Sequence, residues 1–388
     1  MLTHSIEAAA ATGQDGTISL AFELSKSRWL VARLLPGSNK FSRFRLDGGD
    51  TAGLLQLLTE ARRKAAQLGF PKARVVSCYE AGYDGFWLHR WLLDHGVDNR
   101  VLDPASIEVP RRARRAKTDK IDLDKLMRVQ LALDRGEPRV CSVVHVPTVA
   151  QEDAKRASRE RAFLLRERIS HTNRIKGLLH CHGLRDLNPL ARNFLAGLEE
   201  LVTPDGRRLS PGLLAELRRE HARLVLVVAQ IAALEAQARA QTQQALPGTP
   251  AAKIAVLLRL KSMGLIWSTL LVNEVFYRDF QNRRQLGAYL GLVGTPYNSG
   301  QSVREQGISR AGNARARNAA LEFAWLWVRN QPNSALTLWF LNRVGDTKGG
   351  FRKSAITALA RKLMIALWRY LETGLVPTGA VLRANATR

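Results

Sequence analysis

The chain has 388 residues, of which 46% are hydrophobic, so it is long enough to bury a sizeable core in two or three domains. Lys and Arg number 59 against 34 Asp and Glu, which gives a formal net charge of +25 at pH 7. The hydrophobic content excludes a disordered basic tail, and the charge balance points to a polyanionic partner, most often nucleic acid. A ribosome-associated or membrane-surface protein would share the positive charge.

The cellular compartment is predicted from the lack of a secretory signal, a membrane-spanning segment and a disulfide framework in the sequence. The first residues, MLTHSIEAAAATGQDG, show no basic region followed by an apolar one, so we expect no secretory signal. No apolar run has the length needed to span a bilayer. The scattered Cys78, Cys141 and Cys181 form no disulfide framework and suit a reducing compartment. We therefore expect a soluble cytoplasmic protein, associated with the nucleoid.

Strand and helix patterns alternate over the first 130 residues. The expected elements, in order, are three strands within 17–46, a helix over 51–69, a strand over 73–80, a helix over 85–96, a strand over 99–103 and a helix from Asp119. The order β-β-β-α-β-α-β-α is that of the ribonuclease H-like fold, a mixed sheet flanked by helices. This α/β domain is assigned to residues 1–150.

Long helices are predicted between residues 151 and 245. In the second of them, Leu217, Leu224 and Ile231 repeat at intervals of seven, which indicates a short coiled-coil seam. The seam could join two chains as a dimerisation arm, or pack against the preceding helix of the same chain. The linker LPGTP marks a boundary, and residues 246–388 are expected to form a mainly α C-terminal domain.

The basic segment RRARRAKTDKIDLDKLMR at 111–128 contains three aspartates, Asp119, Asp122 and Asp124. Asp119 and Asp122 are three residues apart, so on a helix they share one face, where two carboxylates repel unless a cation lies between them. Glu23 and Glu80 each close a predicted strand. Carboxylate oxygens are the ligands that Mg²⁺ prefers, and four acids can hold two such ions for phosphodiester cleavage.

The basic residues around these acids have a complementary predicted role, which is to hold the DNA backbone over the metal site. They are Arg111, Arg112, Arg114, Arg115 and Lys117. The alternative is that the aspartates cap a helix and pair with neighbouring Lys and Arg. The strand-end positions of Glu23 and Glu80 favour the metal site.

A second group of candidates lies in the run YNSGQSVREQGISRAGNARARNAAL, expected to be a loop between two helices with Ser299 on a flexible turn. Its guanidinium groups come from Arg304, Arg310, Arg315 and Arg317. A serine in such surroundings can attack phosphorus, because the cations stabilise the developing charge. On these residues alone, a loop that only grips phosphate is the alternative.

Four motifs together resemble the DEDD-type insertion-sequence transposases, the group that includes the Piv-like DNA invertases and the bridge-RNA-guided recombinases. They are FELSKSRW, YEAGYDGFWLHRWL, DPASIEVPRRARRAKTDKIDLDKL and LGAYLGLVGTPYNSG with its downstream GISRAGNARAR. The resemblance covers roughly residues 17–130 and 255–325. It implies a RuvC-like N-terminal domain, a coiled-coil arm over 151–245, and a C-terminal transposase domain.

Carried over position by position, the resemblance assigns metal-binding and catalytic roles to Glu23, Glu80, Asp119 and Asp122, with Mg²⁺ as cofactor, and a nucleophilic role to Ser299. The first acid is usually Asp in the family, so Glu23 is a departure whose extra methylene shifts the carboxylate by about one bond length. The resemblance also implies a structured guide RNA that pairs with donor and target DNA, and a homo-oligomer, a dimer or tetramer, built through the coiled coil.

The sequence thus predicts a DNA transposase or recombinase that mobilises an insertion sequence through a serine–DNA intermediate. Two alternatives stay open. One is a RuvC-like Holliday-junction resolvase that uses water as the nucleophile, and the other is a catalytically weakened nucleic-acid-binding relic.

Overall fold

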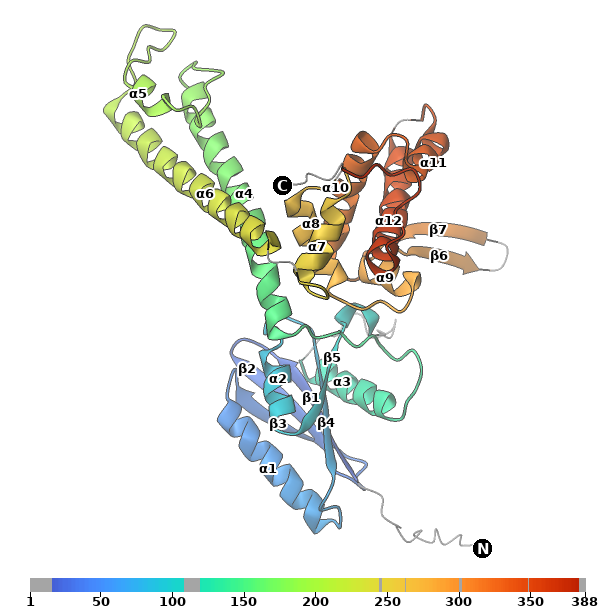
Figure 1. Cartoon of the computed structure of the whole chain (residues 1–388). Helices are drawn as coiled ribbons and strands as arrows, with labels where there is room; N and C mark the ends of the chain where they lie inside the picture. The colour runs from blue at the N-terminus through green and yellow to red at the C-terminus, as the bar shows by residue number, and fades with distance from the viewer. Residues whose placement is uncertain are drawn as a thin grey trace, which may run out of the picture. The chain divides into compact units, whose positions relative to one another are not determined.

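The computed structural model describes residues 16–107, 119–243, 246–261, 263–299, 302–347 and 349–383 (Figure 1). The chain divides into two compact units, Met1–Val146 and Pro147–Arg388. Each unit has hydrophobic clusters of its own.

A five-stranded mixed sheet forms the centre of the first unit. Its strands are β1 Thr17–Leu24, β2 Arg28–Leu34, β3 Ser42–Asp47, β4 Arg74–Glu80 and β5 Val97–Leu102. The strand order is β3-β2-β1-β4-β5. β2 is antiparallel to both of its neighbours, whereas β1, β4 and β5 run parallel to one another.

Helices cover both faces of this sheet. The helices are α1 Thr51–Gln67, α2 Trp87–Asp94 and α3 Asp119–Asp134, with a 3-10 turn at Pro104–Ser106. α1 and α2 share a core with Leu20 and Phe22 of β1, whereas α3 packs its Leu123 and Met127 against Ala21, on the opposite face. The predicted order of strands and helices in this unit is confirmed.

The second unit begins with a helical hairpin. Its helices are α4 Val149–His180, the short α5 Phe194–Leu198 and α6 Pro211–Gln243. α4 and α6 run antiparallel, because Arg161 near the start of α4 pairs with Glu235 near the end of α6, and Arg174 pairs with Glu216, both at 2.6 Å.

The predicted heptad seam lies inside this hairpin. Leu217 and Leu224 cluster with Ile175 of α4, and Ile231 clusters with Leu164. All five side chains are buried. The apolar repeat is therefore covered by packing within one chain, the second of the two alternatives for it.

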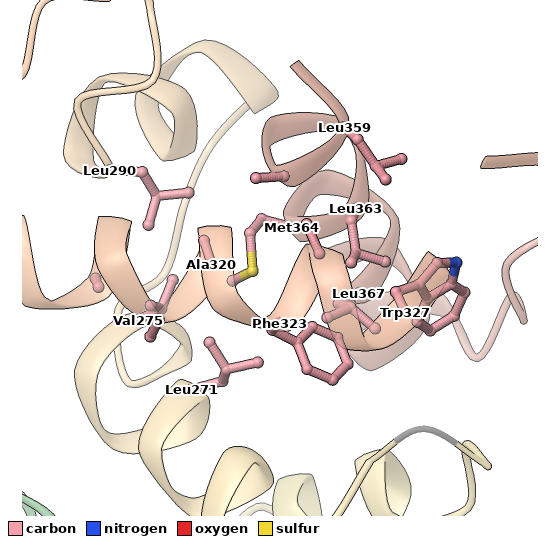
Figure 2. Close-up of a cluster of buried hydrophobic side chains, with 14 of the residues drawn as sticks. Leu271, Val275, Leu290, Ala320, Phe323, Trp327, Leu359, Leu363, Met364 and Leu367 are labelled. Atoms are coloured by element: carbon pink, nitrogen blue, oxygen red, sulfur yellow. The ribbon is translucent and has the colours of Figure 1, made fainter. Parts of the chain in front are cut away.

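A mainly helical bundle with one hairpin of strands completes the second unit. Its elements are α7 Pro250–Leu258, α8 Leu265–Leu271, a π-helical segment Val272–Phe276, α9 Arg283–Tyr289, β6 Gly294–Ser299, β7 Ser302–Ile308, α10 Ala314–Asn330, α11 Ala335–Val344 and α12 Gly350–Thr373. Figure 2 shows its core, in which Phe323 and Trp327 of α10 pack against Leu363 and Leu367 of α12.

Candidate active site

Glu23 and Glu80 lie at the ends of neighbouring parallel strands. β1 and β4 are in register at Phe22 and Tyr79, and the two glutamates are the next residues along their strands. Both line one cavity of about 420 Å³, together with Asp84. The structure thus brings together two of the four acids that the sequence singles out.

The two glutamates also belong to the face of the sheet that α3 covers. Side chains alternate between the two faces along a strand, so Glu23 shares a face with Ala21, and Glu80 shares a face with Cys78. Ala21 and Cys78 are both buried in the cluster beneath α3. Glu23 and Glu80 therefore lie on the same face of the sheet as Ala21 and Cys78, which α3 covers.

The direction of α3 is fixed by two contacts with β4. Arg74 at the start of β4 pairs with Asp134 at the end of α3, and the Cys78 thiol lies 3.5 Å from the carbonyl oxygen of Leu126. From Asp134 to Leu126 the helix spans about 12 Å, and from Arg74 to Cys78 the strand spans about 13 Å, so the two run antiparallel.

This register places Asp122 level with Glu80. Glu80 lies two strand residues beyond Cys78, a distance of about 7 Å, which the helix covers in about four residues. Counting four residues back from Leu126 reaches Asp122, whose side chain is half-buried. Asp119 is the first residue of α3, and its side chain lies outside the described part of the structure.

Asp124 has a different environment. Arg43 of β3 donates two hydrogen bonds to its carboxylate, at 2.9 and 2.7 Å. The alternative interpretation of the acidic segment, in which aspartates pair with nearby cations, therefore holds for Asp124.

The donor chemistry of this pocket suits a hard cation, because Mg²⁺ prefers carboxylate oxygens and keeps its other positions for water and phosphate. Glu23 and Glu80 supply two such groups in one cavity. Among the side chains that the structure describes, no three His, Cys, Asp or Glu residues come close enough to hold a metal ion. The suitability of this pocket for Mg²⁺ therefore depends on the carboxylate donors and on the one cavity that Glu23 and Glu80 both line.

Three further residues line the same cavity and were missed in the sequence: Lys26, Tyr83 and Asp84. Tyr83 is 97% exposed, although it is a large aromatic residue. An ammonium group can bind a phosphate, and an exposed aromatic ring can stack on a base. Their positions in the sequence could have indicated them, because Lys26 lies shortly after Glu23 in FELSKS, and Tyr83 and Asp84 lie shortly after Glu80 in YEAGYD.

The predicted basic cluster of Arg111, Arg112, Arg114, Arg115 and Lys117 falls outside the described residues. Arg304 belongs to β7 by its backbone, and its side chain is likewise outside the described part. Arg310 is exposed, with a positive φ of 55°.

The other two predicted phosphate-binding arginines contact the protein itself. Arg315 donates to the carbonyl oxygen of Ser158 at 2.7 Å, and its Nε lies 3.4 Å from Glu274. Arg317 donates to the carbonyl oxygens of Leu290 and Ala311 at 3.3 and 3.2 Å. These contacts connect the GNARAR segment with α4 and with the end of α9.

Ser299 is the last residue of β6 and is paired with Ser302 of β7. The expectation of an irregular loop between two helices is therefore wrong for 297–299 and 302–308, because these residues belong to the antiparallel strands β6 and β7. Tyr297 and Val303 are typical strand residues that the Gly, Ser and Asn content obscured. The Ser299 side chain lies outside the described part, and the residue belongs to the second unit, whereas the four predicted acids belong to the first.

A buried carboxylate organises the second unit. Glu274 lies in the π-helical segment and is fully buried. Arg159 of α4 donates two hydrogen bonds to it, at 2.7 and 3.0 Å. Asn313, which follows Gly312, donates a hydrogen bond to the Tyr289 hydroxyl at 2.8 Å. That hydroxyl in turn donates to the backbone carbonyl oxygen of Glu274 at 2.6 Å. The signal in the sequence was a lone acid in the apolar run LLVNEVF.

Lys155 lies beside this network and is almost completely buried. Burial lowers the pKa of its ammonium group to about 8, partly offset by the attraction of Glu274. The ammonium nitrogen lies 3.6 Å from the centre of the Tyr277 ring. A cation of this kind is held at a cost in folding free energy.

In the part of the chain that the structure describes, every helix is too short or too polar to cross a membrane. Residues 254–338 match the sequence model described as "Transposase IS116/IS110/IS902 family".

The chain is also similar to known proteins over almost its whole length. It is 46% identical over 381 residues to "Putative transposase y4rJ" of Sinorhizobium fredii, covering 95% of each chain. It is 25% identical over 344 residues to "Transposase for insertion sequence element IS1111A" of Coxiella burnetii, covering 84% of this chain and 86% of that one. The chain belongs to the IS116/IS110/IS902 family of transposases.

Proposed function

We propose that this transposase mobilises an insertion sequence by cutting and rejoining DNA at the pocket that Glu23 and Glu80 line. Transposases bind DNA, and the net charge of +25 suits that partner. The observation that carries the proposal is the pair of carboxylates at the ends of neighbouring parallel strands, on the face where Asp122 comes level with Glu80.

The first unit is proposed to be RuvC-like, that is, ribonuclease H-like. Its mixed sheet, with one antiparallel strand and helices on both faces, supports this assignment. In this proposal Glu23, Glu80, Asp119 and Asp122 hold Mg²⁺, which would supply charge stabilisation at the phosphate and activation of the attacking oxygen. Lys26 holds a phosphate of the bound strand, and Tyr83 stacks on a base next to it.

Ser299 is the proposed nucleophile. Its Oγ forms a bond to phosphorus while the bond from phosphorus to one sugar oxygen breaks, and the serine proton is transferred away so that the leaving sugar ends as a hydroxyl. A serine hydroxyl needs a base at neutral pH. The segment YNSGQSVREQGISR has no His, and Glu305 is its only acid. The group that activates the serine is therefore proposed to come from the acidic pocket, and attack by a sugar hydroxyl on the serine–DNA bond rejoins the strand and releases the serine.

A structured guide RNA and a homo-oligomer are further parts of the proposal, and they rest on the motifs shared with the bridge-RNA-guided recombinases. The heptad residues Leu217, Leu224 and Ile231 are covered within one chain. We therefore assign the oligomer contact to other surfaces than this seam.

Trapping of a covalent adduct tests the proposal. The protein is incubated with insertion-end DNA and Mg²⁺, denatured, and analysed for DNA attached to the polypeptide. The wild type and Ser302→Ala should give the adduct, and Ser299→Ala should give none, because Ser302 is the partner of Ser299 in the strand pair but not the nucleophile. Cleavage without any adduct would support the junction resolvase instead, and no cleavage by the wild type would support the relic.

A further inference from the structure

Three aromatic side chains of the second unit form a row with cations between them, which we call the aromatic row. Arg352 of α12 lies over the ring of Trp325 in α10, at 5.4 Å from its centre. Arg343 lies 5.9 Å from the rings of both Trp339 and Phe351. Lys362 lies 4.7 Å from the Trp339 ring. Phe351 and Arg352 are consecutive residues of α12, so this helix contributes to both sets of contacts, and it packs against both α10 and α11 (Figure 1).

Two of the three rings, those of Trp325 and Phe351, reach the surface, whereas Trp339 is half-buried and packs against the core of the bundle. Trp325 is 40% and Phe351 is 45% exposed, whereas their neighbours Phe323 and Trp327 are fully buried in the bundle. Arg343, Arg352 and Lys362 are all exposed. Over residues 335–370, Asp346 is the only acid in the sequence, and the exposed Glu322 lies three residues before Trp325 in α10. The row therefore offers aromatic rings in contact with an excess of cations over residues 335–370, namely Arg343, Arg352 and Lys362 against Asp346 alone.

This combination matches one kind of ligand. Single-stranded nucleic acid exposes the flat faces of its bases, which stack on aromatic rings and on guanidinium planes, while its phosphates attract the cations. A duplex keeps its base faces stacked inside and presents only phosphates and groove edges. An acidic protein would be attracted by the cations but would make no particular use of spaced aromatic rings.

We propose that the aromatic row is a binding surface for single-stranded nucleic acid, with Trp325 and Phe351 as stacking platforms. Arg343, Arg352 and Lys362 pair with phosphates on either side of the stacked bases. The surface is formed by the second unit alone, so the inference does not depend on the acidic pocket or on Ser299.

The experiment uses the full chain and four fluorescently labelled probes of one mixed sequence: single-stranded DNA, single-stranded RNA, and the duplex of each. Binding is measured for Trp325→Ala, Phe351→Ala and Trp325→Tyr. Leu338→Ala is the matched control, because Leu338 is an exposed apolar residue of α11 at 48% and is not part of the row. Thermal unfolding and circular dichroism check that each variant is folded.

Each alanine variant should bind at least one of the single strands about tenfold more weakly, as expected when one stacking platform is lost, and Trp325→Tyr should restore most of the affinity. Duplex binding and the Leu338→Ala variant should match the wild type. The comparison of DNA with RNA tells which strand the row accepts. Unchanged single-strand binding in both folded alanine variants, or equal losses for single strand and duplex, would overturn the proposal; the former would leave a protein partner or a purely structural role for the row.

Discussion

Arg43 of β3 donates two hydrogen bonds to Asp124 of α3, at 2.9 and 2.7 Å. Asp122, two residues earlier on the same helix, instead comes level with Glu80 on the α3 face of the sheet. The segment KIDLDK therefore contains one aspartate tied to the sheet by an ion pair and one whose position along the helix is level with Glu80. Asp124 can therefore serve as the control residue when the role of Asp122 is tested.

The positive charge should make DNA binding strongly dependent on salt. With 59 Lys and Arg against 34 acids, binding neutralises many phosphates and releases their counterions. When the logarithm of the binding constant is plotted against the logarithm of the salt concentration, the slope should be about −0.9 for each phosphate contacted. Titrations by fluorescence anisotropy over a series of salt concentrations measure this slope, and a flat line would contradict the assignment of the charge to nucleic acid.

Lys155 predicts a pH dependence of folding. Its pKa in the folded chain is about 8, because burial disfavours the charge, and it lies below the value near 10.4 expected in the unfolded chain. Between these pH values the unfolded state holds more protons, so this residue makes the fold more stable as the pH rises. Below pH 8 both states are protonated and the full cost of the buried cation remains.

Substitution of the lysine isolates this effect. The free energy of unfolding of Lys155→Met, measured with urea, should exceed that of the wild type near pH 7, and the difference should shrink by roughly 2–3 kcal/mol as the pH approaches 10. Comparing the two proteins at each pH removes the contribution of other groups, such as Tyr289, whose pKa is raised by burial. A difference that stays constant with pH would show that Lys155 titrates normally.

Gly312 predicts a steric limit in the GISRAGNAR motif. Its φ is +79°, and an added Cβ would lie 2.4 Å from the carbonyl oxygen of Tyr289. Gly307 has a similar φ of +88° but open space around it. Gly307→Ala should therefore cost only about 1 kcal/mol of unfolding free energy, the price of the left-handed backbone, and Gly312→Ala should cost clearly more. Equal losses in urea denaturation would mean that the loop can move away from α9.

The division of Ser299 and the predicted acids between two units leads to a complementation test. Ser299→Ala and Asp119→Ala should each be inactive in cleavage, because one lacks the proposed nucleophile and the other a proposed metal ligand. If the serine of one chain works with the acids of a partner, mixing the two variants should restore partial cleavage. Mixtures that form hetero-oligomers but remain inactive would contradict a shared site, and activity in either single variant would remove that residue from the mechanism.

Much of the first unit could be predicted because its signals are local. Alternating side chains in TISLAFEL and the apolar run RVVSCYE define strands by period, and the helix over Thr51–Gln67 follows from its repeating leucines. The strand-end positions of Glu23 and Glu80 follow from the same pattern. Their neighbourhood does not, because it depends on β1 and β4 pairing across about fifty intervening residues.

The second unit was harder to predict where long-range contacts override local composition. Gly, Ser and Asn in the run that begins at Tyr297 suggest a loop, yet backbone pairing of β6 with β7, as between Tyr297 and Arg304, outweighs them. The sequence alone favours phosphate binding by Arg315 and Arg317, because it does not show that they donate hydrogen bonds to the carbonyl oxygens of Ser158 and Leu290. Glu274 could be noticed as an acid among apolar residues, but its arginine partner lies 115 positions away in the chain.

The role of Asp122 in DNA cleavage is tested by comparing Asp122→Asn with Asp124→Asn in Mg²⁺-dependent cleavage of insertion-end DNA. Both substitutions remove one carboxylate charge from the same helix, so the change in charge is matched. Asp122→Asn should abolish cleavage while DNA binding stays nearly intact, and Asp124→Asn should retain cleavage and lose only about 1 kcal/mol or less of stability from the exposed ion pair with Arg43. Cleavage retained by Asp122→Asn, or lost equally in both variants, would contradict the assignment of the strand-end acids and Asp122 to the active site.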